Sequence, residues 1–160
     1  MPEKKINKYL IFILTIICLS LIFAFVVEYI LGHVPCTLCL YQRIPYILAI
    51  VLILIIIIVK KYERVILFLL SILFAISAIL AFYHFGIEQN FFSESFVCEN
   101  KILSNVLSKD QLLEQLKKES ISCKDVSFKV MGLSLATINT IFSFFLSVIF
   151  IKLFKHYGKN

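Results

Sequence analysis

Four long apolar runs, separated by shorter polar segments, dominate the hydrophobic pattern of the chain. They cover approximately residues 9–31, 44–59, 65–85 and 130–151. A helix that crosses the hydrocarbon core of a bilayer needs about 20 apolar residues, and tilt or local thinning accommodates a shorter run such as the second. The pattern therefore predicts an all-α membrane protein, a bundle of four transmembrane helices in a single domain over residues 1–160.

The polar segments between the runs predict the orientation of the bundle. Nine Lys and Arg residues lie at the two termini and in the turn at residues 60–64, whereas Arg43 stands alone in the segment 32–43. Cationic residues favour the cytoplasmic side of a membrane, so we expect both termini in the cytoplasm. Residues 32–43 and the long loop 86–129 then lie on the outer side, because a long loop translocates largely regardless of its lysines.

Composition agrees with a membrane protein. Hydrophobic residues make up 61% of the chain and charged residues 16%, whereas soluble domains have about 45–50% and about 25%. The net charge of +6 comes largely from the short flanks of the apolar runs. We therefore interpret it as a topology signal and expect contact with membrane lipid, not with nucleic acid.

The long loop contains a helical pattern of its own. Apolar residues recur with helical spacing from Ile102 to Leu116, and Ser108 with Gln111 fits a capping box. This pattern predicts short amphipathic helices, which either lie on the membrane surface or are fully solvated.

The five cysteines divide into two groups and one leftover. Cys18 lies in the middle of the first run, where a cysteine behaves as a small apolar residue. Cys36 with Cys39, and Cys98 with Cys123, lie outside the runs and on the same side of the predicted bundle. If that side is a bacterial periplasm, disulfides can persist there.

Cys36 and Cys39 form a Cys-x-x-Cys motif, which favours thiol–disulfide exchange. The spacing places two sulfurs within one helical turn, where a disulfide forms with little rearrangement and one thiol can resolve a mixed disulfide on the other. The alternatives are a structural disulfide and half of a metal site, but a zinc site needs further ligands and only His33 is close in the sequence. We therefore expect redox chemistry and no metal.

Arg43 follows Cys39 by four residues. On a continuous helix Cys36, Cys39 and Arg43 share one face, so a fixed cation would stand beside a thiolate. Pro45 disfavours helical geometry at Ile44, or else marks the first turn of the second span. The alternative is that Arg43 anchors the helix at the level of the lipid headgroups.

Cys98 and Cys123 are 25 positions apart in the long loop. A bridge between them would remove roughly 3.5 kcal/mol of unfolded-chain entropy on the loop-closure account, so a structural disulfide is one interpretation. The presence of a second cysteine pair on the same side of the membrane favours the other interpretation, in which the two pairs exchange.

Three parts of the sequence resemble one known family. Residues 35–45, PCTLCLYQRIP, closely resemble the signature of the DsbB-type disulfide bond formation proteins. Further likeness lies in residues 83–88, YHFGIE, in the Ser-Cys at 122–123, and in residues 132–139, GLSLATIN. The resemblance covers nearly the whole chain.

The resemblance implies a four-helix enzyme that oxidises a periplasmic, thioredoxin-like dithiol protein of the DsbA type in the bacterial inner membrane. Cys98 and Cys123 would take electrons from the donor thiols, and Cys36 and Cys39 would deliver them to a non-covalently bound quinone, ubiquinone or menaquinone. Arg43 and Cys39 match family positions beside the quinone.

Two further polar residues lie near the outer ends of spans. His84 is either a structural histidine or a proton carrier, and the resemblance makes it a candidate residue of the cofactor site. Glu28 lies about one turn inside the end of the first span, where we favour an interfacial carboxylate that extends to the headgroups.

Two alternative functions remain at this stage. A membrane thiol reductase would run the electrons in the opposite direction, as would a bundle of the vitamin K epoxide reductase kind, although those place their Cys-x-x-Cys late in the bundle. A non-enzymatic membrane scaffold would use the cysteines for structural disulfides or metal. Bound quinone in the purified protein would separate these classes from a thiol:quinone oxidoreductase.

Overall fold

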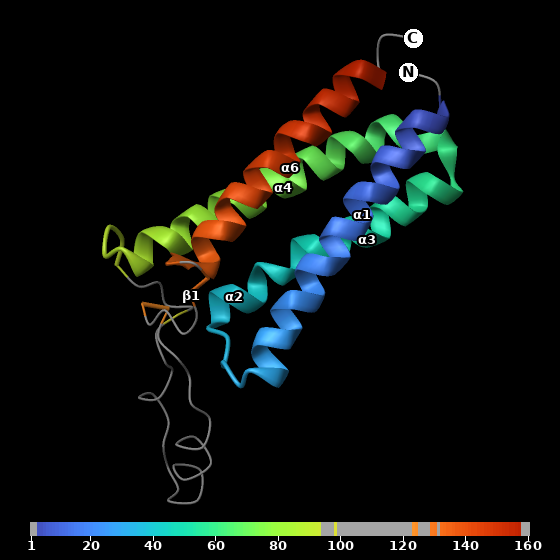
Figure 1. Ribbon diagram of the computed structural model, residues 1–160. Helices are drawn as coiled ribbons and strands as arrows, with labels where there is room; N and C mark the ends of the chain where they lie inside the picture. Colours follow the sequence, from blue (N-terminus) through green and yellow to red (C-terminus); the bar gives the residue numbers. More distant parts are fainter. Residues whose placement is uncertain (1–2, 94–97, 99–122, 125–128, 131, 158–160) are drawn as a thin grey trace, which may run out of the picture.

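The computed structural model describes residues 3–93, 98, 123–124, 129–130 and 132–157 (Figure 1). The predicted amphipathic helices of the long loop lie outside these residues. Within them, the four-span fold is confirmed, because four helices are long and apolar enough to cross a membrane. They are Ile6–Ile30, Thr37–Ile58, Glu63–Glu88 and Leu135–His156.

The first span is helix α1 (Glu3–Phe25), continued by a π-helical turn, η1 (Val26–Ile30). The N–H of Leu31 closes that turn on the carbonyl of Val26, at 3.1 Å. Gly32 follows with a φ of +71°, a backbone conformation that favours glycine, and the chain leaves the helix there.

The second span begins earlier than its apolar run. Helix α2 (Thr37–Tyr41) leads through Gln42 into α3 (Arg43–Ile58), so the span starts at the Cys-x-x-Cys motif and not near residue 44. Cys36 caps α2, because its sulfur accepts the backbone N–H of Cys39 at 3.4 Å. Pro45 lies in the first turn of α3, where a missing N–H costs no helical hydrogen bond.

The third and fourth spans also differ slightly from their apolar runs. A short 3-10 turn, η2 (Lys60–Tyr62), joins α3 to α4 (Glu63–Glu88), which is longer than predicted at both ends. The fourth span, α6 (Leu135–Tyr157), starts after a small antiparallel hairpin of β1 (Lys129–Val130) and β2 (Leu133–Ser134). The apolar run near 130 therefore begins as strand, before the helix.

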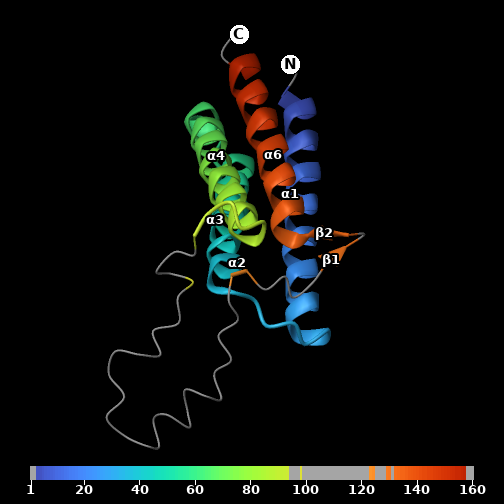
Figure 2. The same ribbon diagram turned by 90° about the vertical axis from the view of Figure 1, so that its left-hand side faces the viewer.

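The four helices pack in the order α1, α3, α4, α6, and the most extensive contact joins α4 to α6. The start of α1 and the last described turn of the fourth span lie at the same end of the bundle, as four spans require (Figures 1 and 2). Buried serines line the contact between α4 and α6: Ser77 and Ser143 hydroxyls are 3.1 Å apart, and Ser147 donates to the carbonyl of Ser71 at 3.1 Å. Small polar residues of this kind let membrane helices approach closely.

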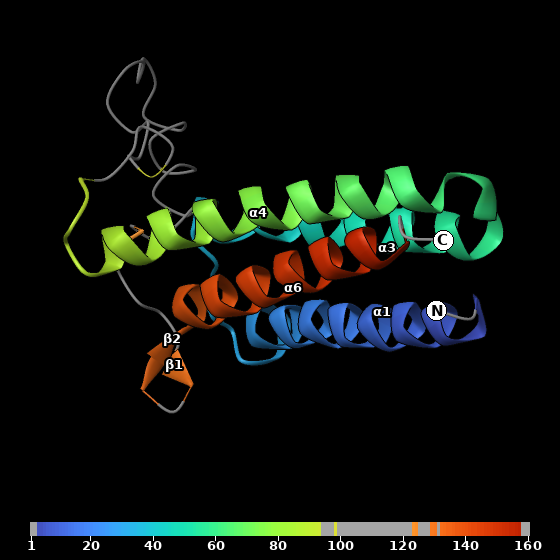
Figure 3. The ribbon, with the colours of Figure 1, turned by 90° about the horizontal axis from the view of Figure 1, so that it is seen from above.

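The outer surface of the bundle is apolar. Large hydrophobic side chains face outward on every span, including Phe12, Ile58, Ile79 and Phe144. The interior holds a second apolar set, including Leu10, and the helices run side by side when seen from above (Figure 3). A protein that is apolar both inside and outside suits lipid surroundings, and the chain is a multi-pass membrane protein.

Candidate functional site

The two cysteine groups meet at the end of the bundle opposite the termini. Cys36 and Leu38 pack in one buried cluster with Ile87, at the end of α4, and with Cys98 and Cys123 of the long loop. The structure thus brings together the four cysteines that the sequence singled out, because Cys39 packs against the same cluster. Cys18 lies elsewhere, midway along α1.

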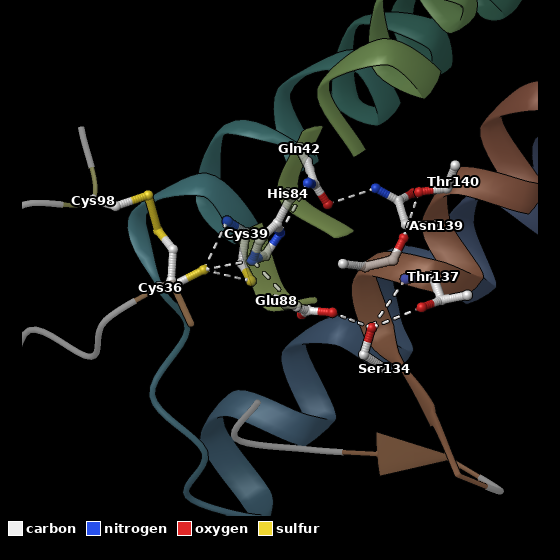
Figure 4. Close-up of polar contacts among 12 residues, drawn as sticks. Cys36, Cys39, Gln42, His84, Glu88, Cys98, Ser134, Thr137, Asn139 and Thr140 are labelled. Atoms are coloured by element: carbon white, nitrogen blue, oxygen red, sulfur yellow. Dashed lines mark hydrogen bonds and ion pairs between the residues drawn. A yellow bond between two sulfur atoms is a disulfide. The ribbon is translucent and has the colours of Figure 1, made fainter. Parts of the chain in front are cut away.

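The two pairs differ in redox state. Cys98 and Cys123 form a disulfide with a Cα–Cα distance of 5.6 Å, and both residues are buried. Cys36 and Cys39 are free thiols whose sulfur atoms are 2.9 Å apart. Figure 4 shows the disulfide beside Cys36, so an oxidised pair lies next to a reduced pair.

Three hydrogen-bond donors surround the sulfur of Cys36. The Cys39 thiol and the Cys39 backbone N–H approach it on one side, and Nε2 of His84 lies 3.5 Å away. The hydrogen bond from Cys39 has the largest effect and lowers the pKa of the Cys36 thiol to about 4, although burial of the sulfur opposes it. His84 lowers the same pKa through its hydrogen bond. Cys36 is therefore suited to be a thiolate at neutral pH.

A chain of buried hydrogen bonds extends from His84 to the core of the bundle. The amide of Gln42 donates to Nδ1 of His84 at 3.1 Å, and its oxygen accepts from the amide of Asn139 at 2.7 Å. The oxygen of Asn139 in turn accepts from the hydroxyl of Tyr46, which lies 3.0 Å from that of Ser143. These bonds join α3, α4 and α6 through Gln42, which lies between α2 and α3. Figure 4 shows the part of the network from His84 through Gln42 to Asn139.

This network determines the tautomer of His84. Because Gln42 donates to Nδ1, the neutral ring carries its proton on Nε2, which faces Cys36. Nε2 is also 3.8 Å from Oε1 of Glu88, whose other oxygen accepts from the hydroxyl of Ser134. His84 is only 2% exposed, so these contacts replace water around the ring.

A cavity of about 530 Å³ opens beside the motif, between α1 and α6. Most side chains of its walls are apolar, and Cys39 is part of the wall. That volume and that lining are typical of a site for a small apolar molecule with a polar head. The polar side chains in the wall include Glu28, His33, Gln42, Arg43, Tyr46 and Asn139.

Arg43 lies in the cavity wall and pairs with Glu28. Its guanidinium donates to the Glu28 carboxylate and stands 5.0 Å from the ring centre of Phe25. The structure therefore places Arg43 beside the cavity that Cys39 also lines, and not against the sulfur of Cys36. Glu28 pairs with this cation of α3 and lies in the cavity wall.

The residues that the sequence predicted for the site fall in two different places. Cys39 and Arg43 line the cavity, whereas His84 lies behind Cys36 and is absent from the described cavity wall. The sequence reasoning missed Gln42, Asn139 and the pairing of Glu28. A usable signal existed for them, because each is a polar residue within or next to an otherwise apolar span.

Comparison with known proteins identifies the family. The family model for "Disulfide bond formation protein DsbB" matches residues 7–153. The chain belongs to the DsbB family. A protein of Rickettsia prowazekii (strain Madrid E), named "Uncharacterized protein RP370", is 30% identical over 161 residues, which cover 98% of this chain and 93% of that protein. No solved structure matches the chain.

Membership of the DsbB family confirms the resemblance seen in the sequence. It gives the chain a role in disulfide bond formation and a disulfide oxidoreductase activity. Two adjacent cysteine pairs at one end of a membrane bundle are the chemical groups that such an activity needs.

Proposed function

We propose that this DsbB family member oxidises a periplasmic thioredoxin-like dithiol protein of the DsbA type and passes the electrons to a membrane quinone. The observation that carries the proposal is the packing of the Cys98–Cys123 disulfide against Cys36, with Cys39 opening onto an apolar cavity. The order of transfer would be donor thiols, loop disulfide, Cys-x-x-Cys, quinone.

The first half of the reaction uses the loop pair. A donor thiolate attacks the Cys98–Cys123 disulfide, forms a mixed disulfide and releases one loop thiolate. The second donor thiol then resolves that bond, so the donor leaves oxidised and the loop pair holds two electrons. A loop thiolate next attacks the Cys36–Cys39 disulfide by the same exchange, and the packing of the two pairs supports this step.

The second half of the reaction uses the reduced motif. Cys36 is a thiolate, which is the form in which a cysteine acts as a nucleophile, and Cys39 lies at the cavity wall. A bound quinone would supply an acceptor for two electrons and two protons. Donors of the DsbA type are already strongly oxidising, at about −120 mV, so their reoxidation needs an acceptor of higher potential.

The residues of the cavity suit a quinone. Apolar side chains of α1 and α6 would hold the ring and its tail, and the side chains of Gln42, Arg43 and Asn139 offer hydrogen-bond donors in the cavity wall. We propose that Arg43 and Cys39 contact the bound molecule. His84 would act through Cys36, whose charge it stabilises.

We also propose that residues 1–160 act as a single domain in a bacterial inner membrane, with both termini cytoplasmic and the cysteine site periplasmic. The positively charged flanks lie at the end of the bundle that holds the termini, and the site lies at the other end. This orientation places the thiols in a compartment where disulfides persist.

A turnover assay of purified protein in detergent tests the proposal. Reduced thioredoxin-like donor and a quinone would be mixed with the parent, with Cys98→Ser, and with Cys18→Ser as a matched control outside the site. We expect quinone reduction by the parent and by Cys18→Ser, and none by Cys98→Ser. Turnover of Cys98→Ser at the parental rate would show that the loop disulfide is structural and would exclude the proposed path.

A further inference from the structure

Three atoms of the kinds that bind soft metal ions converge at the motif. The sulfurs of Cys36 and Cys39 and a ring nitrogen of His84 all lie within 4.8 Å of one another. The sulfurs are 2.9 Å apart, and Nε2 of His84 is 3.5 Å from that of Cys36. The sequence pointed only to His33 as a nearby ligand, whereas the fold supplies His84 from α4, 48 positions after Cys36.

We propose that Cys36, Cys39 and His84 bind one Zn²⁺ ion when the motif is reduced. The Cys36 thiolate, the Cys39 thiol and Zn²⁺ give a zinc dithiolate and one released proton, which comes from Cys39, and no electron is transferred. This site goes beyond the proposed electron path and does not depend on it, because zinc binding needs only the two thiolates and the neutral ring.

One of the two observed ligand distances already fits such a site, and the other requires a small movement of Cys39. Zinc–sulfur bonds of about 2.3 Å and zinc–nitrogen bonds of about 2.0–2.1 Å in a tetrahedron place sulfur and nitrogen about 3.6 Å apart. The Cys36–His84 distance of 3.5 Å already meets this value. Two sulfurs on one zinc ion lie about 3.8 Å apart, so Cys39 must move away by about 0.9 Å. Cys39 borders the cavity and is partly exposed, which leaves it room to move.

The electrostatics also favour this ligand set. One Zn²⁺ ion and two thiolates carry no net charge, so the complex avoids the cost of burying an isolated ion. Coordination through Nε2 leaves the ring proton of His84 on Nδ1, where the amide of Gln42 lies 3.1 Å away. When the amides of Gln42 and Asn139 both turn over, the Gln42 oxygen accepts this proton and Gln42 still bonds to Asn139. This is the second hydrogen bond that ligating histidines usually make.

Zinc binding would depend on the redox state of the motif. The Cys36–Cys39 disulfide has no thiolate to offer, so only the reduced pair binds the ion. A disulfide requires sulfurs about 2.05 Å apart, whereas zinc holds them about 3.8 Å apart. Bound zinc would therefore keep this pair reduced and prevent it from accepting electrons from the loop pair.

Cobalt titration of the full chain tests the site directly. Protein in detergent is reduced with a phosphine under anaerobic conditions and titrated with Co²⁺, whose thiolate charge-transfer and tetrahedral absorption bands report the ligands. We expect one ion per chain, displaced by Zn²⁺. Cys36→Ser and His84→Ala should each weaken binding at least tenfold, whereas Cys18→Ser and a Cys98→Ser/Cys123→Ser double variant should bind like the parent.

A second measurement follows the rate at which a small disulfide reagent oxidises the reduced motif, with thiols trapped by an alkylating agent. We expect Zn²⁺ to slow this oxidation at least tenfold, and a chelator to restore it. The proposal is overturned if Cys36→Ser keeps the cobalt spectrum, if air-oxidised protein binds as tightly, or if Zn²⁺ leaves the rate unchanged. None of these results bears on the electron path, because neither donor nor quinone is present.

Discussion

The sulfur of Cys36 is surrounded by groups that donate hydrogen bonds. The thiol and N–H of Cys39 approach this sulfur, as does Nε2 of His84, which is also 3.8 Å from a carboxylate oxygen of Glu88. The contacts from Cys39 and from His84 each stabilise a thiolate more than a thiol. The burial of Cys36, which opposes ionisation, is outweighed by these contacts. In the proposed function, these neighbours keep Cys36 ionised before any substrate arrives.

The first prediction concerns the pH dependence of Cys36 reactivity. Because its pKa is lowered to about 4, the thiolate is present throughout the neutral range and its alkylation rate should change little with pH. Cys39→Ala removes the largest cause of the lowering, so the pKa should rise towards the ordinary thiol value of about 8.5. The alkylation rate of Cys36 in this variant should then increase with pH through the neutral range.

The measurement is the alkylation rate of Cys36 against pH, in reduced protein with a metal chelator present. Cys39→Ser keeps a hydroxyl donor and should give a smaller rise in the Cys36 pKa than Cys39→Ala. His84→Ala should give a rise as well, because His84 makes the other lowering contact. A flat profile in Cys39→Ala and His84→Ala would refute this account of the thiolate.

The second prediction concerns Arg43, whose charge is paired with Glu28 at the cavity wall. We expect Arg43→Ala to lower the quinone reduction rate by about 10²–10³, the usual effect of losing one preorganised charge contact. Arg43→Lys keeps the cation but loses the planar fork, so it should retain part of the rate.

The assay uses purified variants, saturating reduced donor and a series of quinone concentrations. Arg64→Ala is a matched control, since Arg64 packs over the ring of Phe154 at the other end of the bundle. Glu28→Gln should reduce the rate less than Arg43→Ala, because it leaves the cation in place. Equal turnover of the parent and Arg43→Ala would remove Arg43 from the site and leave it as a membrane anchor.

At the scale of the elements, each helix contributes specific residues to the site. α2 carries the motif, α4 brings His84 behind it, and α6 brings Asn139 to Gln42. The buried hydroxyls between α4 and α6 hold the last two helices in register, with Ser143 bonded to Ser77 and to Tyr46. A shift of α6 along α4 would therefore separate Asn139 from Gln42.

The third prediction concerns this helix contact. Ser143→Ala removes hydrogen bonds between membrane helices, which on average contribute about 0.6 kcal/mol each, so it should destabilise the bundle only slightly. Ser143→Leu forces a large side chain into a position that is 0% exposed, and overpacking of this kind costs about 1–3 kcal/mol.

The free energy of unfolding is measured by adding increasing amounts of a denaturing detergent and monitoring the helical circular dichroism signal. Ile79→Leu is the control, since Ile79 is 68% exposed on the outer face of α4 and should tolerate the change. Equal stability of Ser143→Leu and the parent would mean that α4 and α6 do not pack as described.

The fold was predictable because lipid imposes a simple rule on the sequence. Every backbone group must be paired within a helix, so four apolar runs of sufficient length indicate four helices. The start of α2 was not predictable in the same way, because the capping of a helix by Cys36 depends on a local turn and not on hydropathy. The strand before α6 depends likewise on Gly132, which has a φ of +85°.

The site was predictable only as far as residue type and spacing allow. The Cys-x-x-Cys motif and the family likeness pointed to the sulfurs, since two thiols at this spacing favour disulfide exchange. Contacts between distant residues, such as Glu28 with Arg43 or Gln42 with Asn139, arise from the packing of helices. No periodicity in one helix reports which side chain of another helix it will meet.

At the scale of the whole molecule, the two ends of the bundle differ in chemistry. The start of α1, the η2 turn and the end of α6, whose sequences are rich in Lys and Arg, lie at one end, and both cysteine pairs lie at the other (Figure 1). This asymmetry leads to the last prediction. Cationic flanks stay in the cytoplasm, so the cysteine end should face the periplasm.

Reporter fusions measure that orientation. We expect fusions at residue 62 and at the C-terminus to report a cytoplasmic position, and fusions near residue 110 to report a periplasmic one. The physical reason is that moving nine Lys and Arg residues across the membrane is opposed far more strongly than moving Arg43, the single cation of the 32–43 loop. An inverted pattern would place Cys36, Cys39, Cys98 and Cys123 in a reducing compartment, where the loop disulfide could not persist. That result would exclude the proposed oxidation of periplasmic thiols, however reactive the individual cysteines are.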